Sequence, residues 1–251
     1  MTNDDFLEET LDDLRVGGLK ILQSTNGYRF SIDPILLCAF ARVERGEEVV
    51  DLGTGSGVIP LVLARRTAAA HIVGVEVQGQ LAERARRSVA LNGLQGRIRI
   101  LHADVRDLDQ MLEPRSFSVV LSNPPFRAAG SGRLAPQDER AAARHELTGG
   151  LEDFLRAAAR LLKPGGRFYV VYLAERLVDL LDGMRRAGLE PKRLRCVHGR
   201  LGEPARLVLV EGRRGGRAGL ALEAPLVVFC GEEYSAEVRA YYDPEDPVAE
   251  D

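Results

Sequence analysis

Three glycines at alternate positions follow an acidic residue in the sequence DLGTGSG, which spans residues 51–57. Gly53, Gly55 and Gly57 let the backbone turn tightly and approach a ligand closely, where any Cβ would intrude. The spacing differs from the GxGxxG of dinucleotide-binding proteins. Asp51 would repel a pyrophosphate, whereas its carboxylate favours a ligand that carries an ammonium group. The turn therefore predicts a binding site for the amino-acid end of a ligand.

Two further acids follow the next apolar runs of the chain. Glu76 lies near the end of IVGVEV, 19 positions after Gly57, and a carboxylate there can accept hydrogen bonds from both hydroxyls of a ribose. Asp104 lies in HADV and can accept a hydrogen bond from an exocyclic amine such as that of adenine. We assign the neighbouring Val77 and Val105 to the same binding segments. An amino acid, a ribose and an adenine together describe S-adenosylmethionine, which we therefore expect as the cofactor.

Short apolar runs alternate with helical segments around these residues. Strands are expected at EVVDLG, IVGVEV, IRILHADV, FSVVLS and RFYVVYL, and helices at GVIPLVLARRT, GQLAERARRSVALNG, LEDFLRAAARLLKPGG and LVDLLDGMRRAG. This alternation predicts βαβ units, and hence an α/β fold with a mostly parallel sheet and helices on both faces. Ligands of such sheets bind outside the carboxyl ends of the strands, which is where the glycine turn, Glu76 and Asp104 occur.

The two ends of this region show different patterns. LKILQSTNGYRFS has apolar stretches on both sides of Asn26 and Gly27, which predicts a hairpin because both central positions of a type I′ turn favour positive φ. DPILLCAFARV predicts a helix with Pro34 in its first turn, behind a capping Asp33. Near the other end, ARLVLVEGRRGGRAGLALEAPLVVF predicts two strands joined by a Gly/Arg-rich turn, an antiparallel C-terminal hairpin.

Charge is distributed unevenly along the chain. Residues 1–13 and 243–251 hold eleven acids and no Lys or Arg, which leaves 26 acids against 34 Lys and Arg between them, a net charge of +8. A basic body permits a polyanionic partner, although solvated Arg-rich helix faces would give the same charge. We expect one domain at 17–242, with the hairpin and first helix at 17–45, between an acidic segment at 1–16 and the acidic tail at 243–251.

Several classes of protein are not indicated by the sequence. No apolar stretch approaches the 18 or so residues that span a bilayer, and the acidic start lacks the features of a signal peptide, so we expect a cytoplasmic protein without a membrane partner. Cys38, Cys196 and Cys230 are widely spaced and form no CxxC pair. Neither a disulfide framework nor a metal site is therefore predicted.

The ordered motifs VVDLGTGSG, VEV, HADV and SNPPF resemble those of the class I S-adenosylmethionine-dependent methyltransferases, over about residues 17–235. This resemblance implies a Rossmann-like, seven-stranded sheet with an antiparallel final strand. QSTNGYRFSIDPILLCAF before the glycine turn and ARHEL after SNPPF are similar to the bacterial tRNA1(Val) adenine-37 N6-methyltransferase family. The implied activity is N-methylation of an exocyclic amine of a nucleic-acid base, foremost adenine N6 in tRNA.

The resemblance also gives SNPPF, residues 122–126, a role. Members of the class with Asn-Pro-Pro-aromatic methylate planar amino groups, whose nitrogen lone pair is conjugated. The Asn123 side-chain oxygen and the Pro124 carbonyl would accept both N–H groups and favour the pyramidal nitrogen of the transition state. Phe126 would stack on the target base, a contact worth about 1–3 kcal/mol. We assign catalytic roles to Asn123, Pro124 and Phe126, a cofactor contact to Asn123 as well, and substrate binding to Pro125, which fixes the backbone.

The Gly/Ala/Arg-rich stretch 127–147 follows this motif and carries candidate contacts for the phosphates of a nucleic acid. Arg127, Arg133 and Arg144 are assigned to substrate binding, and a solvated loop without that role is the alternative.

Three other functions stay open: a guanine-N2 methyltransferase of ribosomal RNA, a glutamine methyltransferase acting on a release factor, and a non-catalytic S-adenosylmethionine-binding module. The sequence fixes neither the target position nor the oligomeric state.

Overall fold

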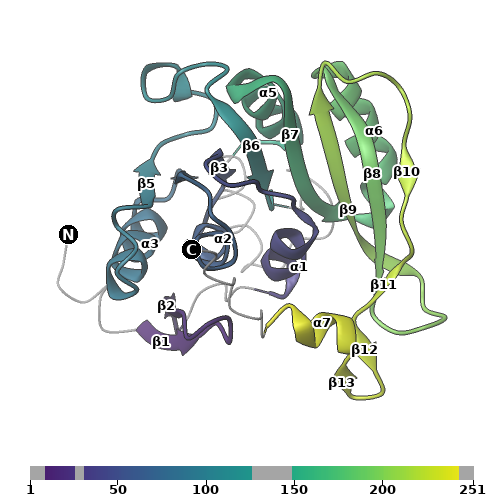
Figure 1. The fold of residues 1–251 in the computed structure, drawn as a ribbon, viewed down its shortest axis with the longest axis horizontal. Helices are drawn as coiled ribbons and strands as arrows, with labels where there is room; N and C mark the ends of the chain where they lie inside the picture. The colour runs from purple at the N-terminus through teal and green to yellow at the C-terminus, as the bar shows by residue number, and fades with distance from the viewer. Residues whose placement is uncertain (1–8, 26–30, 126–148, 243–251) are drawn as a thin grey trace, which may run out of the picture.

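The computed structural model describes residues 9–25, 31–125 and 149–242 (Figure 1). Its centre is a nine-stranded sheet in the order β10-β8-β9-β7-β6-β3-β4-β5, with β11 also paired to β8. The seven longer strands are β3 (Glu48–Leu52), β4 (His71–Glu76), β5 (Ile98–His102), β6 (Phe117–Ser122), β7 (Leu162–Leu173), β8 (Leu189–His198) and β9 (Ala205–Arg214). β10 (Ala221–Leu222) and β11 (Leu226–Val227) have two residues each. The predicted α/β fold with a mostly parallel sheet is confirmed, and the two short strands extend the expected seven.

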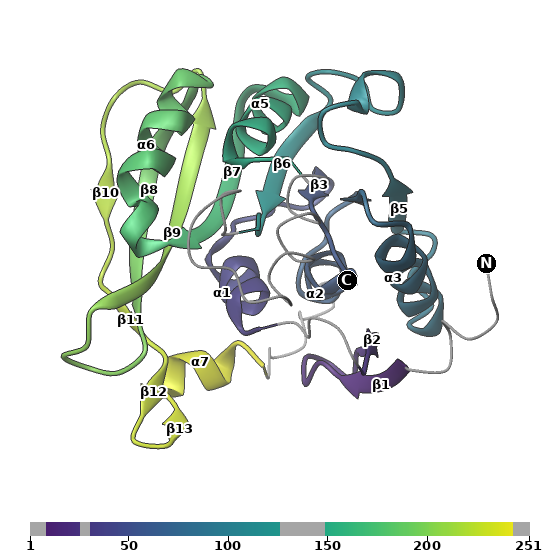
Figure 2. The same ribbon diagram turned by 180° about the vertical axis from the view of Figure 1, so that it is seen from behind.

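Helices cover both faces of the sheet, as the alternating pattern predicts (Figures 1 and 2). One face carries α1 (Asp33–Phe40), α2 (Val58–Arg66) and α3 (Gly79–Leu91), and the other carries α5 (Leu151–Leu161) and α6 (Leu177–Arg186). Single turns of 3₁₀ helix occur at Leu108–Gln110 and Ala174–Arg176.

Two hydrophobic cores follow from these layers, one on each side of the sheet. The neighbouring Val49 and Val50 of β3 are both fully buried, and successive strand residues point to opposite faces. Val49 belongs to the core that includes Leu61 of α2, and Val50 to the core that includes Phe154 of α5. Because both faces are covered, the central strands are apolar at nearly every position, which made them easy to recognise in the sequence.

The described part of the chain has an N-terminal hairpin that begins before the predicted one. β1 (Glu9–Asp13) pairs antiparallel with β2 (Lys20–Ser24), so the partner of β2 comes from the segment that the sequence assigned to an acidic N-terminus. The hairpin lies on α3, where the Ser88 hydroxyl accepts a hydrogen bond from the backbone N–H of Leu22 at 3.0 Å. The predicted turn at Asn26 and Gly27 lies outside the described residues.

The first helix begins at its expected cap, one residue earlier than predicted. Asp33 is the first residue of α1, Ile32 occupies the capping position, and no side chain caps the helix there. Asp33 is buried, and burial raises the pKa of its carboxyl. Pro34 stands in the first turn, as predicted.

The C-terminal hairpin is also formed by other strands than predicted. β9 is antiparallel to both β7 and β8, so the hairpin consists of β8 and β9. The expected partner of β9 across the Gly/Arg-rich turn contributes β10 and β11, which pair in parallel with the other side of β8. A small sheet of β12 (Phe229–Cys230) and β13 (Glu233–Tyr234) follows, and then α7 (Ala236–Ala240).

Candidate active site

The carboxyl ends of β3, β4 and β6 meet at one edge of the sheet. Leu52 is the register partner of both Val75 in β4 and Ser122 in β6. The buried Ser122 hydroxyl donates a hydrogen bond to the Leu52 carbonyl at 2.9 Å. The glycine turn, Glu76 and the segment after Ser122 therefore leave the sheet side by side.

The three glycines of the turn have different surroundings. Gly53, Gly55 and Gly57 all have positive φ, at 77°, 56° and 89°. A Cβ on Gly53 would lie 3.0 Å from the Phe154 ring, and one on Gly57 would lie 3.2 Å from the Ala85 methyl. A Cβ on Gly55 would meet no described atom within 4 Å. Gly55 is therefore the glycine whose backbone faces free space, where a ligand could approach.

Asp51 is a fully buried carboxylate in β3. Neither of its oxygens has a partner among the described residues, and the same holds for the nearby Thr54 hydroxyl. Burial raises the pKa of Asp51 to about 7; the neighbouring Thr54 hydroxyl opposes this rise, and the charge of Glu76 adds to it. An unsatisfied buried carboxylate is costly. A cationic ligand at this edge of the sheet would relieve that cost, which fits the ammonium group expected here.

Glu76 connects the glycine turn to β4. One of its carboxylate oxygens accepts from the backbone N–H of Gly55 at 2.9 Å, and the other accepts from that of Gln78 at 2.9 Å. Burial raises the pKa of Glu76, and these backbone hydrogen bonds act in the opposite direction. Each oxygen keeps lone pairs for further donors, so the expected contact with ribose hydroxyls is chemically possible.

Asp104 is already engaged within the chain. Its carboxylate accepts from the Arg106 side chain at 2.9 and 2.5 Å and from the Arg106 backbone N–H at 2.8 Å. These contacts lower the pKa of Asp104. A carboxylate offers about four lone-pair sites, so one is left for the predicted adenine contact. Val105 packs in the core on the α5 side, and Val77 lies directly after Glu76 in the turn that leaves β4.

Asn123, Pro124 and Pro125 follow β6 without a break. Pro124 is buried, and Asn123 and Pro125 are half-buried. No hydrogen bond within the described part of the chain involves the Asn123 side chain, so its amide oxygen is available to a ligand. The other residues assigned to acceptor binding, Phe126, Arg127, Arg133 and Arg144, lie outside the described residues, and their roles stay predictions.

A family model described as the methyltransferase small domain matches residues 33–180, which include every site residue named so far from Asp51 to Asn123. The chain belongs to this family.

Two solved structures show the same fold as this methyltransferase domain. A predicted O-methyltransferase from Agrobacterium tumefaciens is 25% identical, with a TM-score of 0.68, covering 84% of this chain and 95% of its own. TrmN from Thermus thermophilus is 26% identical, with a TM-score of 0.52, covering 72% of this chain and 48% of its own.

Relatives with a shared name are also similar in sequence. A tRNA1(Val) (adenine(37)-N6)-methyltransferase from Phocaeicola vulgatus is 33% identical over 214 residues, which are 84% of this chain and 88% of the relative. The protein of that name from Porphyromonas gingivalis is 36% identical over 158 residues, which are 61% of each chain. The match thus spans about three fifths of the latter relative's length.

Two residues near the site of the methyltransferase domain were not assigned a role from the sequence. His102, at the end of β5, is the register partner of Glu76, and its Nε2 lies 3.0 Å from the Val77 carbonyl. The ring of Phe154 in α5 lies against the glycine turn, so close that it leaves little room for a Cβ on Gly53. His102 stands at a strand end, a position that could have marked it; Phe154 carries no such signal because its partner is 101 residues away.

Other kinds of site are not indicated in the described ranges. Within residues 9–25, 31–125 and 149–242, no group of three or more His, Cys, Asp or Glu side chains could hold a metal ion. No helix of the same ranges is long and apolar enough to cross a membrane.

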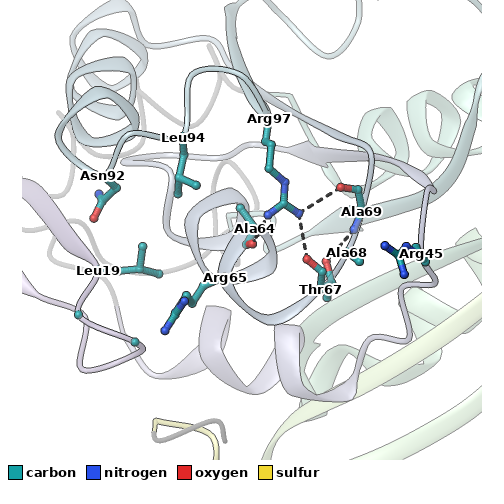
Figure 3. A pocket seen from close by; sticks show the side chains of 12 residues that line it. Leu19, Arg45, Ala64, Arg65, Thr67, Ala68, Ala69, Asn92, Leu94 and Arg97 are labelled. Carbon is teal, nitrogen blue, oxygen red and sulfur yellow. Dashed lines mark hydrogen bonds between the residues drawn. The ribbon is translucent and has the colours of Figure 1, made fainter. Parts of the chain in front are cut away.

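A hollow of about 690 Å³ lies near the starts of β4 and β5, at the opposite edge of the sheet from the glycine turn (Figure 3). It therefore does not belong to the candidate active site.

Proposed function

We propose that this protein transfers a methyl group from S-adenosylmethionine to the N6 amine of an adenine in tRNA. Its family and the names of its relatives support this reaction and this substrate. The observation that carries the proposal is the position of Asn123 and Pro124 directly after β6, next to the strand whose glycine turn would hold the cofactor. A tRNA substrate also implies a cytoplasmic location.

The cofactor would be held by residues from three strand ends. Asp51 offers its unpaired carboxylate to the ammonium group of the methionine end, and the open backbone at Gly55 allows close approach. Glu76 would accept hydrogen bonds from the ribose hydroxyls, and Asp104 from the adenine amine, with Val77 and Val105 beside them. When bound, S-adenosylmethionine supplies a methyl group on a positively charged sulfur.

The acceptor amine would be held by Asn123 and Pro124. Both oxygens accept hydrogen bonds, so they fix the two N–H groups and direct the nitrogen lone pair away from them. The adenine amine becomes positively charged as it is methylated and then releases one proton. Two neutral acceptors stabilise the charged nitrogen without a strong base, and orientation supplies much of the remaining rate enhancement. Phe126 would stack on the adenine ring, and Pro125 would keep the backbone rigid.

Substrate access requires that the adenine leave its stack or lie in a single-stranded loop. Arg127, Arg133 and Arg144 would contact phosphates next to the target base.

We also propose that the hairpin, the sheet and its helices form one domain. The N-terminal limit of this domain extends to β1.

Transfer of labelled methyl groups tests this function. Purified protein would be incubated with labelled S-adenosylmethionine and, separately, unmodified tRNA, ribosomal RNA, DNA and a release factor, followed by nucleoside or amino-acid analysis of the products. We expect label in tRNA as N6-methyladenosine. Label as N2-methylguanosine or methylglutamine would overturn the adenine assignment, and cofactor binding with no label in any acceptor would overturn the proposed reaction.

A further inference from the structure

Four arginines surround a groove at the end of the sheet opposite Asn123. Arg115, Arg213, Arg214 and Arg217 line a hollow of about 730 Å³, together with glycines, alanines and one proline but no acidic residue. We call it the arginine groove. It is formed by the segment before β6, the start of β7, the end of β9 and the end of α6, which come together at the top of the view in Figure 1.

In the described part of the chain, no ion pair joins any of the four arginines to a carboxylate. Arg213 donates to the Gly165 carbonyl at 2.9 Å and Arg214 to the Arg160 carbonyl at 3.2 Å, and both acceptors are neutral. Burial and then the positive charge of Arg115 lower the pKa of Arg214. Like charges are therefore held close together around this groove.

Arginines of the neighbouring elements β8 and α6 have acidic partners. Arg193 of β8 forms ion pairs with Glu211 and Glu223, each at 2.6 Å. Glu190, which is the register partner of Arg213 in the β8–β9 pair, forms an ion pair with Arg185 at 3.3 Å. Arginines close to the groove therefore have carboxylate partners within the fold, whereas no acidic residue lines the arginine groove itself. This difference favours the binding of an external anion in the groove.

The arginine groove is open to solvent. Gly165, Gly188 and Gly215 line it with positive φ, and a Cβ added to any of them would meet no described atom within 4 Å. Lys192 adds a further cation, because its Nζ donates to the Arg217 carbonyl at 3.0 Å. An anionic chain could therefore lie along this surface without displacing packed side chains.

The hollow in Figure 3 also contains arginines but serves a different purpose. There the Arg97 guanidinium donates to the carbonyls of Ala64, Thr67 and Ala69 at 2.6, 2.9 and 3.1 Å, so it caps the end of α2 (Figure 3). A cation at a helix C-terminus is stabilised by the helix dipole.

Arg214 of the arginine groove has a similar role, because it donates to the carbonyls of Arg160 and Leu162 at the end of α5. The side chains of Arg115 and Arg217 have no such acceptor among the described residues.

We infer that the arginine groove binds the phosphate backbone of the RNA substrate at a point remote from the target base. This inference rests on the proposed function. Arginine recognises phosphate through bidentate hydrogen bonds and keeps its charge at all physiological pH values. Arg115 precedes β6 and Asn123 follows it, eight positions later, so the Cα atoms of these two residues are at most about 26 Å apart at about 3.3 Å per residue. A folded RNA is long enough to contact both.

Binding of full-length unmodified tRNA at several salt concentrations tests the groove. The double variant R115Q/R217Q removes two exposed charges without a carboxylate partner. We expect its Kd to rise about tenfold, and the slope of log K against log salt to become shallower by about 1.5, because each phosphate contact contributes about 0.7–0.9 to that slope. The matched control R45Q/R99Q removes two other exposed charges, and we expect the control to keep the wild-type slope.

A short RNA separates the groove from the active site. A fragment with one nucleotide on either side of the target adenine is too short to reach the arginine groove, so wild type and R115Q/R217Q should bind and methylate it equally. Three results would each contradict RNA binding by the arginine groove: unchanged tRNA affinity in R115Q/R217Q, an equal loss of affinity in the control variant, or an equal loss with the short fragment.

Failure of the proposed function gives a different result. Wild-type protein that binds tRNA through the groove without methylating adenine would contradict the function alone. Wild-type protein that binds no RNA would contradict both proposals.

Discussion

The Ser122 hydroxyl donates a hydrogen bond to the Leu52 carbonyl at 2.9 Å, and both residues are fully buried. Leu52 is followed at once by the first glycine of the turn, and Ser122 by Asn123. A single side chain therefore joins the segment that would hold the cofactor to the segment that would hold the acceptor amine. Their relative position determines whether methyl donor and acceptor are aligned.

Replacing Ser122 by Ala should lower the rate of methyl transfer more than it lowers cofactor affinity. The loss of one buried hydrogen bond costs about 1 kcal/mol of folding free energy and lets Asn123 shift relative to the turn. We expect kcat to fall several-fold while the Kd for S-adenosylmethionine stays within twofold. Ser88→Ala is the control, because the Ser88 hydroxyl is equally buried and both of its hydrogen bonds lie away from the site: it donates to the Arg84 carbonyl at 2.9 Å and accepts from the Leu22 N–H at 3.0 Å. A kcat loss of the same size in both variants would mean that Ser122 acts only on stability.

Gly55→Ala tests the open space beside the glycine turn. At φ 56°, any Cβ is strained by about 1–2 kcal/mol, and here it would also project into the space assigned to the cofactor. We expect S-adenosylmethionine affinity, measured by calorimetry, to fall at least about tenfold. Gly93→Ala provides the comparison, since Gly93 has φ 67° and no atom within 4 Å of an added Cβ but ends α3 outside the site. Equal cofactor affinity in the two variants would contradict the assignment.

Cofactor affinity should depend on pH through Asp51. Its pKa is raised to about 7 from an ordinary value of 3.8, so the empty site is substantially protonated below pH 7, whereas an ammonium ligand requires the charged form. Affinity should therefore fall as pH decreases below 7, by up to about tenfold per pH unit. The Asp51→Asn variant should bind more weakly and with a flatter profile. A wild-type affinity that is constant between pH 6 and 8 would exclude an ionised Asp51 from cofactor binding.

The same residue should affect folding stability in the absence of ligand. A carboxyl whose folded pKa lies above its unfolded value holds its proton more tightly in the folded state, so ionisation costs stability as pH rises from about 4 to 7. Thermal denaturation of Asp51→Asn should lose that contribution, and the variant should gain stability relative to wild type as pH increases over this range. A difference that does not vary with pH would show that Asp51 stays charged in the empty protein.

The sheet centre and the glycine turn were predictable because their signals are local. The central strands are apolar at nearly every position, and positive φ at Gly53, Gly55 and Gly57 follows from a turn that other residues adopt poorly. The order of the strands places Asp51, Glu76 and Asn123 at one edge, as the alternating pattern implies.

The sheet edge near the C-terminus was missed for physical reasons. β8 contains Pro191 and three Lys and Arg residues, so it lacks a continuous apolar run, and its strand form depends on pairing with β9. Without β8, the nearest candidate partner for β9 was the segment across the Gly/Arg-rich turn. The ion pairs of Glu9 with Arg84 and Arg87 were equally invisible, because they join residues more than 70 positions apart.

Asn123→Ala tests the central claim most directly. Cofactor affinity and single-turnover methyl transfer to unmodified tRNA would be measured with wild type and variant, with N6-methyladenosine as the product detected. The account predicts that wild type forms this nucleoside, and that the variant binds S-adenosylmethionine with nearly unchanged affinity but loses at least about a hundredfold in transfer rate, as expected when a preorganised hydrogen-bond partner of the transition state is removed. Transfer to tRNA at the wild-type rate by Asn123→Ala would contradict it.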